Sequence, residues 1–334
     1  MQNEIKTKTL LLNKRGLLDV KGYSKRMNFI YNRNQVKSFP LKLKEWNFYQ
    51  FIKDKYVLQL TIGHVSYMCN IAVTLFNIET NERKSVSLMK PFYKPKLDVN
   101  PEEESVIEYK NKNNYIVFKT LKDKRILEFK GSNKEYKKVD IYIEIENDIN
   151  NEKMVIATPF INKKQFYLNY KENYYYVNGY VCFDEKKVDF NNSQGLIDWG
   201  RGIWPYRHEW YWGNLTSFID NIPFGFNIGW GFGNLDYATE NMFFYNKKAY
   251  KLNQLTVQRD ENDYLKPWII KDEEDLFYLE FSPIYNNFTK NEYFVINTKC
   301  NQVFGIFKGY IKIENKKIEF ANILAFIEHA INRW

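Results

Sequence analysis

The sequence is poor in the residues that usually build metal sites and disulfide bonds. Its three cysteines, Cys69, Cys182 and Cys300, are far apart, are odd in number and form no C-x-x-C pair. That spacing argues against a disulfide framework and against a zinc site. Three histidines in the whole chain argue against any other dedicated transition-metal site. We therefore expect no bound metal, and reduced thiols suggest a cytoplasmic protein.

The motifs of common cofactor chemistry are also missing. The chain has no G-x-x-x-x-G-K-[ST] loop and no G-x-S-x-G elbow. His208-Glu209 is not followed by a second histidine at the spacing of H-E-x-x-H. The glycine pattern at Gly229–Gly233 lies within a predicted strand and opens no helix, so it is not a dinucleotide fingerprint. We expect no cofactor.

Long apolar runs and clusters of one charge are absent as well. No stretch reaches the ~18 apolar residues of a membrane helix, and Met1–Lys6 lacks the apolar segment of a signal peptide. We expect no integral membrane segment. The net charge is +9, but lysines are interleaved with acids, as in Lys134–Lys138, and no arginine cluster forms. This scattering indicates a solvated surface rather than a nucleic-acid binding face.

Aromatic residues are abundant. Tyr, Phe and Trp make up 18% of the chain and are spread along it, and such residues favour strands. Short runs separated by turn-prone clusters predict an all-β, mainly antiparallel fold. The clearest predicted strands are Tyr56–Ile62, Ile71–Phe76, Ser85–Leu88, Tyr115–Phe118, Arg125–Phe129, Val139–Ile145, Phe166–Tyr170, Tyr174–Val177, Leu276–Phe281 and Val303–Phe307.

The end of the chain has a different pattern. Between Ala321 and Trp334, apolar residues recur at helical spacing, at Ile323, Phe326 and Ile327 and again further on. This periodicity predicts a C-terminal helix that packs over a sheet edge or a barrel end.

The most informative segment is Asp198–Gly213. Gly200 and Gly202 flank Arg201, and glycine admits backbone angles that other residues avoid, so a shaped loop is expected there. Pro205 suits the first residue of the strand that follows.

In that strand the side chains should alternate between two faces. An inward polar face would suit chemistry, whereas an inward aromatic face would form a core or an apolar binding wall. The polar face holds Arg207, Glu209 and Tyr211, and the aromatic face holds Tyr206, His208, Trp210 and Trp212.

The next predicted strand, Gly225–Gly233, alternates cleanly. Phe226, Ile228, Trp230 and Phe232 share one face, and glycines with Asn227 form the other. Glycine weakens a strand, so the row needs a reason. Either the strand coils sharply, or the glycines make room for a ligand or for large side chains opposite. The segment Thr239-Glu240-Asn241 then precedes a hairpin-like turn, Tyr245–Lys248.

The ionisable residues of this region also have purely structural interpretations. Asp198 and Arg201 could form a buried pair that holds the loop. Glu209 could pair with Arg207, and Glu240 could satisfy backbone donors or Arg201. These readings stand beside a catalytic role for the same residues.

The Asp198–Gly213 segment resembles a bacterial family known only as domain of unknown function number twenty-eight-oh-four. Its Asp198–Gly202 core is the most distinctive part, and the resemblance spans nearly the whole chain. Lys247 stands where the resemblance leads us to expect a glycine in the hairpin turn. The other segments that carry it are Gly16–Asp19, Gly22–Arg26, Lys44–Trp46, Phe166–Lys171, Gly225–Gly233, Thr239–Asn241 and Pro267-Trp268.

That family has no assigned activity, but it is distantly similar to lipocalin-like double barrels of the carotenoid hydratase and tocopherol cyclase type. The resemblance implies two lipocalin or calycin-like β-barrel halves, which we place at residues 1–160 and 161–334, and an apolar cavity. Those relatives protonate isoprenoid double bonds with carboxylic acids or only shape the pocket, and a shared fold does not fix a function.

Our first hypothesis is an enzyme without metal or cofactor that hydrates, isomerises or cyclises a lipophilic small molecule. Asp198 or Glu209 would be the acid, because a carboxyl group in an apolar pocket has a raised pKa. Arg201 or Arg207 would orient it or bind an anionic head. The predicted ligand-binding residues are Trp204, Tyr206, Arg207, Trp210, Tyr211, Trp212, Asn227, Glu240 and Asn241.

Two other functions use the same residues. A carrier of a lipophilic ligand would need the pocket walls but no chemistry. A carbohydrate-binding or carbohydrate-active protein would stack sugars on Trp and Tyr, and paired carboxylates at roughly 5–9 Å could hydrolyse a glycoside.

Overall fold

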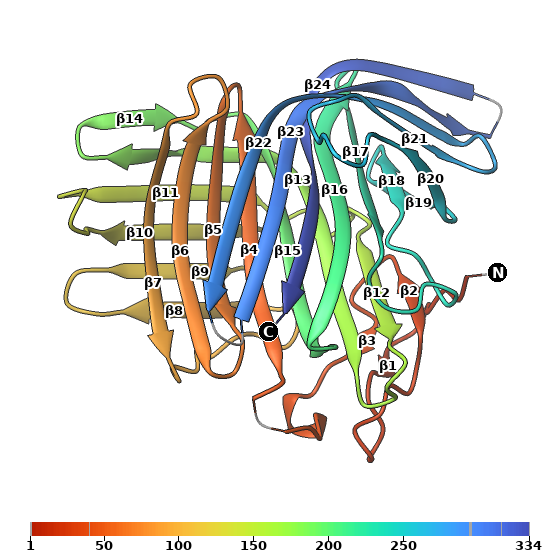
Figure 1. Ribbon diagram of the computed structural model, residues 1–334, viewed down its shortest axis with the longest axis horizontal. Coiled ribbons are helices and arrows are strands. Elements are labelled where there is room, and N and C mark those ends of the chain that lie inside the picture. Colours follow the sequence, from red (N-terminus) through yellow and green to blue (C-terminus); the bar gives the residue numbers. More distant parts are fainter. Residues whose placement is uncertain (1, 40, 294–295, 315, 334) are drawn as a thin grey trace.

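The computed structural model describes residues 2–39, 41–293, 296–314 and 316–333, and nearly all of its regular structure is antiparallel β-strand (Figure 1). Two large sheets curl into two half-barrels, which confirms the all-β expectation. Within the described part of the chain, no helix is long and apolar enough to cross a bilayer.

The first sheet is an open path with three short branches. In pairing order the path is β7 (Arg83–Pro91), β6 (Met68–Asn77), β5 (Tyr56–His64), β4 (Lys44–Lys53), β15 (Ser193–Ile203), β13 (Phe166–Phe183), β11 (Val139–Glu146), β10 (Lys124–Gly131), β9 (Tyr115–Thr120) and β8 (Ser105–Lys110). The branches are β12 (Met154–Pro159), β2 (Gly22–Ser24) and β14 (Lys186–Asp189). Separately, β1 (Thr9–Leu10) pairs in parallel with β3 (Phe29–Ile30), and η1 (Arg33–Gln35) is one 3-10 turn.

The second sheet is built from the rest of the chain. In pairing order it runs β19 (Lys248–Lys251), β18 (Met242–Tyr245), β17 (Ile222–Trp230), β16 (Arg207–Ile219), β24 (Lys316–Arg333), β23 (Ile296–Ile313), β22 (Phe277–Tyr293), β21 (Trp268–Asp272) and β20 (Leu255–Gln258).

The sheets change between Ile203 and Arg207, at the short segment that joins β15 to β16. Residues 160 and 161, where we expect the division between the two halves, lie between β12 and β13, which are paired strands of the first sheet.

Each half-barrel has its own filled core. Strand alternation sends Tyr49, Phe51 and Leu60 into the first core and Phe226 and Ile228 into the second. Because the described side chains fill both interiors, a cavity for a ligand must lie outside the two cores.

A third cluster joins the two sheets through the faces that point away from these cores. Phe76 of β6 packs edge-to-face on Phe304 of β23, with ring centroids 5.1 Å apart, and Trp212 of β16 packs the same way on Phe326 of β24, at 4.9 Å. Polar contacts run beside this cluster: Gln59 donates to the side-chain oxygen of Gln302 at 2.8 Å. The sheets are therefore in direct contact on one side of their interface.

Three long strands reach both halves of the molecule. In Figure 1, β22, β23 and β24 extend from the region of β4 and β5 to the far side of the second half-barrel. Their pairing shifts register between Pro283 and Tyr285 and between Phe307 and Gly309. Bulges of this kind bend a strand, so one end of each strand can close the second core while the other faces the first sheet.

The predicted C-terminal helix is wrong. Residues up to Arg333 belong to β24, and Trp334 lies outside the described residues. Ala325 and Ile327 point into the second core, while Phe326 points into the contact between the sheets. A strand buried on both faces carries a continuous apolar run, and such a run matches helical spacing as well as strand spacing.

The predicted hairpin turn after Tyr245 is present, and the missing glycine does not prevent it. Asn246 and Lys247 join β18 to β19 with φ values of 48° and 66°, the left-handed conformation of a two-residue type I′ turn. Lys247 forms an ion pair with Asp148, which offsets part of the cost of that backbone conformation.

The contact between the sheets predicts a stability effect. Phe304→Ala should lower the free energy of unfolding by about 3–5 kcal/mol, because it opens a cavity where Phe76 and Phe326 now touch a fully buried ring. Phe288→Ala is the control on β22, since that ring is 52% exposed. Urea denaturation measures both, and equal midpoints would contradict the assignment.

Candidate functional site

A large cavity lies between the two sheets, beside the cluster that joins them. Its volume is about 1150 Å³. The lining comes from the first sheet through β4 to β7, β13 and β15, and from the second sheet through β16, β17 and β22 to β24. The pocket is thus a gap between half-barrels, and its walls are the sheet faces opposite to the two cores.

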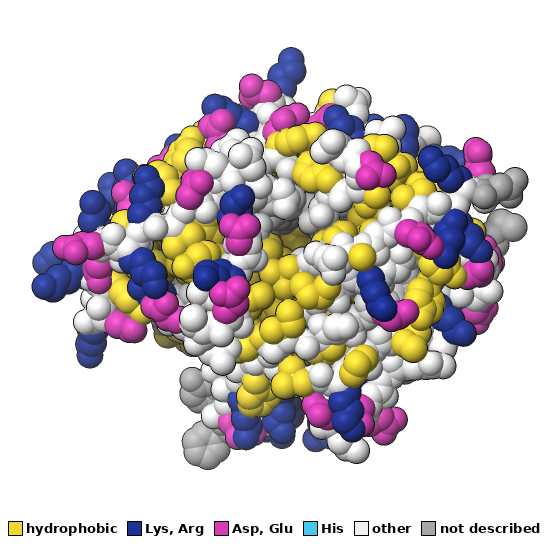
Figure 2. Space-filling view, turned by 90° about the horizontal axis from the view of Figure 1, so that it is seen from above, with side chains coloured by type: hydrophobic (Ala, Val, Ile, Leu, Met, Phe, Trp, Pro, Cys, Tyr) yellow, Lys and Arg dark blue, Asp and Glu magenta, His cyan; other side chains and the backbone are white. Residues whose placement is uncertain are grey.

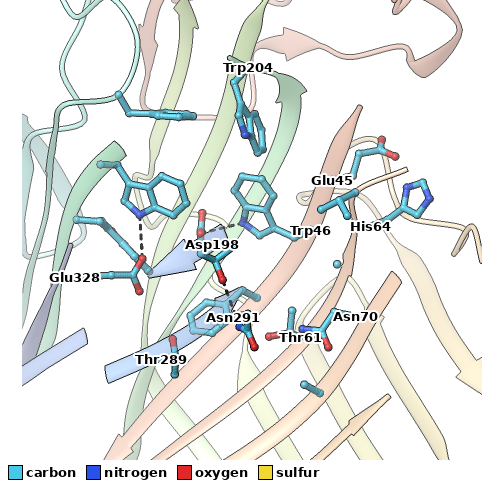
Figure 3. A pocket seen from close by; sticks show the side chains of 18 of the residues that line it. Glu45, Trp46, Thr61, His64, Asn70, Asp198, Trp204, Thr289, Asn291 and Glu328 are labelled. Carbon is cyan, nitrogen blue, oxygen red and sulfur yellow. Dashed lines mark hydrogen bonds between the residues drawn. The ribbon is translucent and has the colours of Figure 1, made fainter. Parts of the chain in front are cut away.

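The register of three strands gathers a polar network around Asp198. On β15, Asp198 pairs with Lys171 of β13 and with Phe48 of β4. The Trp46 indole N–H donates to Asp198 Oδ2 at 3.0 Å, and the Asn169 amide donates to Oδ1 at 2.6 Å (Figure 3). Burial raises the pKa of Asp198, and the Lys171 ammonium opposes that rise.

A second carboxyl group, that of Glu328 on β24, faces the same space (Figure 3). It is held in the same way, because the Trp210 indole N–H donates to Glu328 Oε1 at 2.9 Å. Burial raises its pKa and the charge of Asp198 adds to that rise, while hydrogen bonds from Trp210 and Cys300 and the Lys171 ammonium oppose it. Each acid therefore accepts a hydrogen bond from one tryptophan indole, and Asp198 weakens the ionisation of Glu328.

A buried ion pair stands next to these acids. Lys171 Nζ lies 2.8 Å from Glu240 Oε2 and 4.1 Å from the centroid of the Trp212 ring. Both partners are almost fully buried. The ammonium is thus held by a carboxylate and an aromatic face, a position from which its charge acts on Asp198.

Aromatic rings close one end of the cavity. Trp204 packs on Trp46 with centroids 5.3 Å apart, and Phe232 lies 5.7 Å from Trp204 and 5.6 Å from Trp210. Tyr167 completes this group, 4.9 Å from Phe232. Figure 3 shows Trp204 and Trp46 on one side of the two carboxyl groups.

The Asp198–Gly202 motif is strand, not the expected loop, and its glycines serve close packing. A Cβ on Gly200 would lie 2.1 Å from the Trp46 ring, so only glycine lets this indole cross β15 to reach Asp198. A Cβ on Gly202 would lie 2.3 Å from the Phe166 carbonyl oxygen. Both glycines have ordinary strand backbones.

Arg201 lies on the other face of the same strand. Residues three apart on a strand point in opposite directions, so Arg201 cannot meet Asp198. Its guanidinium instead binds Asp98 at 2.8 Å and the Asn47 side-chain oxygen at 2.8 Å, and stacks 3.9 Å from the Trp199 ring centroid. Fully buried, it fixes the segment around Asp98 to the first half-barrel.

The cavity takes residues from both predicted faces of β16. Trp210 and Trp212 of the aromatic face and Tyr211 of the polar face line it. Tyr206, Arg207 and Glu209 are exposed and lie outside the lining.

Glu209 and Tyr211 belong to a neighbouring cluster around His329. Glu209 Oε1 is 2.9 Å from His329 Nε2. Tyr211, which reaches the edge of the cavity, stacks on the His329 ring with centroids 3.9 Å apart, and its hydroxyl accepts a hydrogen bond from Arg259 at 2.7 Å. Glu209 and Asp198 are therefore not brought together.

Asn227 and Asn241 lie behind the pocket wall and hold it in place. Asn227 accepts the Trp212 indole N–H at 2.8 Å and donates to the Glu240 carbonyl at 3.0 Å. Asn241 accepts the Gly229 N–H at 2.8 Å. A Cβ on Gly229 would lie 3.1 Å from Glu240 Oε2. The glycine row of β17 thus makes room for side chains from neighbouring segments, one of the two reasons considered from the sequence.

With this geometry described, the family can be stated. The profile of a domain of unknown function, DUF2804, matches residues 2–334. The chain belongs to the DUF2804 family. No curated protein matches it in sequence.

Two solved structures align with this DUF2804 chain at low identity, and the first of them shows the same fold. Kievitone hydratase from Nectria haematococca aligns with a TM-score of 0.50 and 12% identity over 98% of each chain. A candidate AttH protein from Nitrosomonas europaea aligns with a TM-score of 0.45 and 8% identity over 89% of this chain and 98% of its own.

Sequence reasoning missed several residues of the DUF2804 site. Trp46, Tyr167 and Lys171 entered only as parts of segments that carry the family resemblance, because nothing local shows that they meet Asp198. Glu328 was missed because its segment was assigned to a helix. The sequence signal that could have revealed Glu328 is a single acidic residue inside an otherwise apolar run.

The buried position of Arg201 predicts a structural effect. Arg201→Ala should lower the free energy of unfolding by about 3–5 kcal/mol, because it leaves Asp98 buried without its partner. Arg207→Ala, at an exposed position, should change it by less than ~0.5 kcal/mol. Urea unfolding followed by tryptophan fluorescence measures both. Similar unfolding midpoints for the two variants would show that Arg201 does not hold Asp98 in place.

Proposed function

We propose that this protein is a cofactor-independent enzyme that protonates a carbon–carbon double bond of a lipophilic small molecule, leading to hydration, isomerisation or cyclisation. The observation that carries the proposal is the pair Asp198 and Glu328, two carboxyl groups with raised pKa that face one aromatic-walled cavity. A neutral carboxylic acid in such surroundings can donate a proton at a pH where it would ordinarily be ionised.

Glu328 is the better proton donor of the two. Burial is the largest cause that raises the pKa of either group. At Asp198 the Lys171 ammonium is the leading cause that opposes this rise, whereas at Glu328 the hydrogen bonds from Trp210 and Cys300 oppose it, the Asp198 charge adds to it and Lys171 acts least. Two acids whose surroundings separate their protonation states are suited to the roles of acid and base. The sequence-based candidate Glu209 has no such position, since it lies outside the cavity.

In a hydration, Glu328 would give its proton to one alkene carbon, and the electron pair of the double bond would form the new C–H bond. The other carbon becomes cationic and takes the oxygen of a water molecule. The surplus proton of that water passes to Asp198, and exchange with solvent restores both acids. The step adds one water and needs no oxidant or reductant.

The cavity walls suit a cationic intermediate. The faces of tryptophan rings attract positive charge, and Trp46, Trp204, Trp210 and Trp212 all line the space beside the acids. Lys171 is neutralised by Glu240, so its ammonium adds little repulsion. The fold shared with kievitone hydratase makes hydration the first reaction to test.

A carrier of a lipophilic ligand would use the same walls but would not need paired acids of raised pKa. The two functions separate in one experiment: native mass spectrometry of the purified protein after long incubation with a bound ligand. A product with altered mass, or with the same mass but altered chromatographic retention after extraction, supports the enzyme, and only unchanged ligand supports the carrier.

Removing either acid should abolish turnover. With an identified substrate, Asp198→Asn and Glu328→Gln should each lower kcat about 10²–10⁴-fold, the range that general acid–base groups supply. Glu209→Gln is the matched control and should keep wild-type kcat, because that carboxylate is outside the cavity. Full activity in both acid variants would end the proposal.

The pH profile should have a basic limb set by Glu328. Its raised pKa means that the protonated donor persists above the ordinary carboxyl value of ~4.3 and is lost as pH rises further, so kcat/KM should fall on that side. Trp210→Phe removes the hydrogen bond that favours the ionised form, so the limb should move to higher pH. A limb that stays fixed in this variant would assign it to another group.

A further inference from the structure

We propose that the substrate is amphipathic, with an apolar part held among the tryptophans and an uncharged, hydroxyl-rich part, such as a sugar, held at the other end of the same cavity. The inference rests on the proposed function where it places the substrate in a reaction. The binding test below does not depend on that function. The observation behind it is that the cavity has two chemically different ends, built from different strands.

The first wall of the polar end is the face of β5, β6 and β7 that points away from the first core. Side chains there are mostly small and hydrogen-bonding, with Met68, Ala72 and Met89 as apolar members. Some pair across strands: Thr74 and Ser85 hydroxyls are 3.0 Å apart. A hydroxyl can donate once and accept twice, so these pairs leave capacity for a ligand. The hydroxyl and amide residues of this wall are Thr61, Asn70, Thr74, Ser85 and Ser87.

The opposite wall has the same chemistry and comes from the other sheet. Thr289 and Asn291 of β22 and Thr298 of β23 line it, and the Asn291 amide donates to the Thr298 hydroxyl at 3.3 Å. Two hydroxyl and amide faces thus meet across a gap. A group between them can receive and give hydrogen bonds on both sides, as a polyol requires and a hydrocarbon cannot.

The charged side chains at the polar end of the cavity do not favour the binding of an anionic group. Lys290 is exposed and paired with Glu292 at 2.8 Å. Arg83 is exposed and donates to Asn287 at 3.3 Å. The electrostatic attraction of exposed, partnered cations is small. Figure 2 shows the same mixture over one face of the molecule, where basic and acidic side chains intermingle around central hydrophobic ones.

The carboxyl groups stand between the two ends. In Figure 3, Trp204 lies on one side of Asp198 and Glu328, while Thr61, Asn70, Thr289 and Asn291 lie on the other. A volume of about 1150 Å³ exceeds the ~300–1,000 Å³ of ordinary small-molecule pockets. It has room for a ring system together with a polar group, and it places the reacting bond near their junction.

The test uses two fluorescent probes that differ by one sugar, 4-methylumbelliferone and its β-glucoside. Binding is measured by calorimetry in the Glu328→Gln background, which prevents turnover. We expect the glucoside to bind at least ten-fold more tightly than the aglycone. The double variant Thr61→Val, Thr289→Val keeps side-chain size and removes two hydroxyls, and it should lose that preference while its affinity for the aglycone stays the same. Thr256→Val, at an exposed position outside the cavity, should keep the preference.

Equal binding of the two probes by the single Glu328→Gln variant would overturn the inference, as would an equal loss of both in the double variant. Failure of the proposed function has a different signature. Then the acid variants would keep their turnover, whereas the preference for the glucoside would still depend on Thr61 and Thr289.

Discussion

The site depends on how two sheets pack through the faces opposite to their cores. Aromatic contacts such as Phe76 on Phe304 fix the sheets against each other on one side, and the same faces then diverge into the cavity. The described side chains fill both barrel interiors, and the cavity between the acids and the tryptophans lies where the halves meet. Residues from both halves must therefore be in place before the two acids face each other, which links the stability of the interface to the integrity of the site.

Strand alternation explains why the short Asp198–Gly202 motif contributes both to the cavity and to the first core. On β15, Asp198 and Gly200 face the cavity, while Trp199 and Arg201 face the first core. The cavity face places an acid and leaves room for the Trp46 indole. The core face uses a buried arginine to hold Asp98. A substitution at Arg201 can therefore disturb ligand binding without any contact between Arg201 and the ligand, and only a stability measurement separates the two effects.

The sequence was informative wherever a signal is local. Aromatic and β-branched runs predicted the all-β class, and Asp198, Trp204, Trp210, Trp212 and Glu240 were all predicted site residues that the structure places on one cavity.

Long-range pairing could not be predicted: nothing near Lys171 shows that it lies beside Asp198. The terminal strand was misassigned because burial on two faces removes the period of two. Arg201, Arg207 and Glu209 were chosen for their charge, but only the parity of each strand decides which face a charge occupies.

The electrostatics of the acid pair argue that the tryptophans do more than form walls. An indole N–H on each carboxyl group favours its ionised form, while burial favours the neutral form. With burial alone, both acids would stay protonated and neither could accept a proton from water. With stronger hydrogen bonding, both would ionise and neither could donate. Asp198 accepts from Trp46 and Asn169 and lies beside the Lys171 ammonium, whereas Glu328 accepts from Trp210 and its pKa is raised further by the Asp198 charge. The surroundings thus act unequally on the two groups, as the separate roles of an acid and a base require.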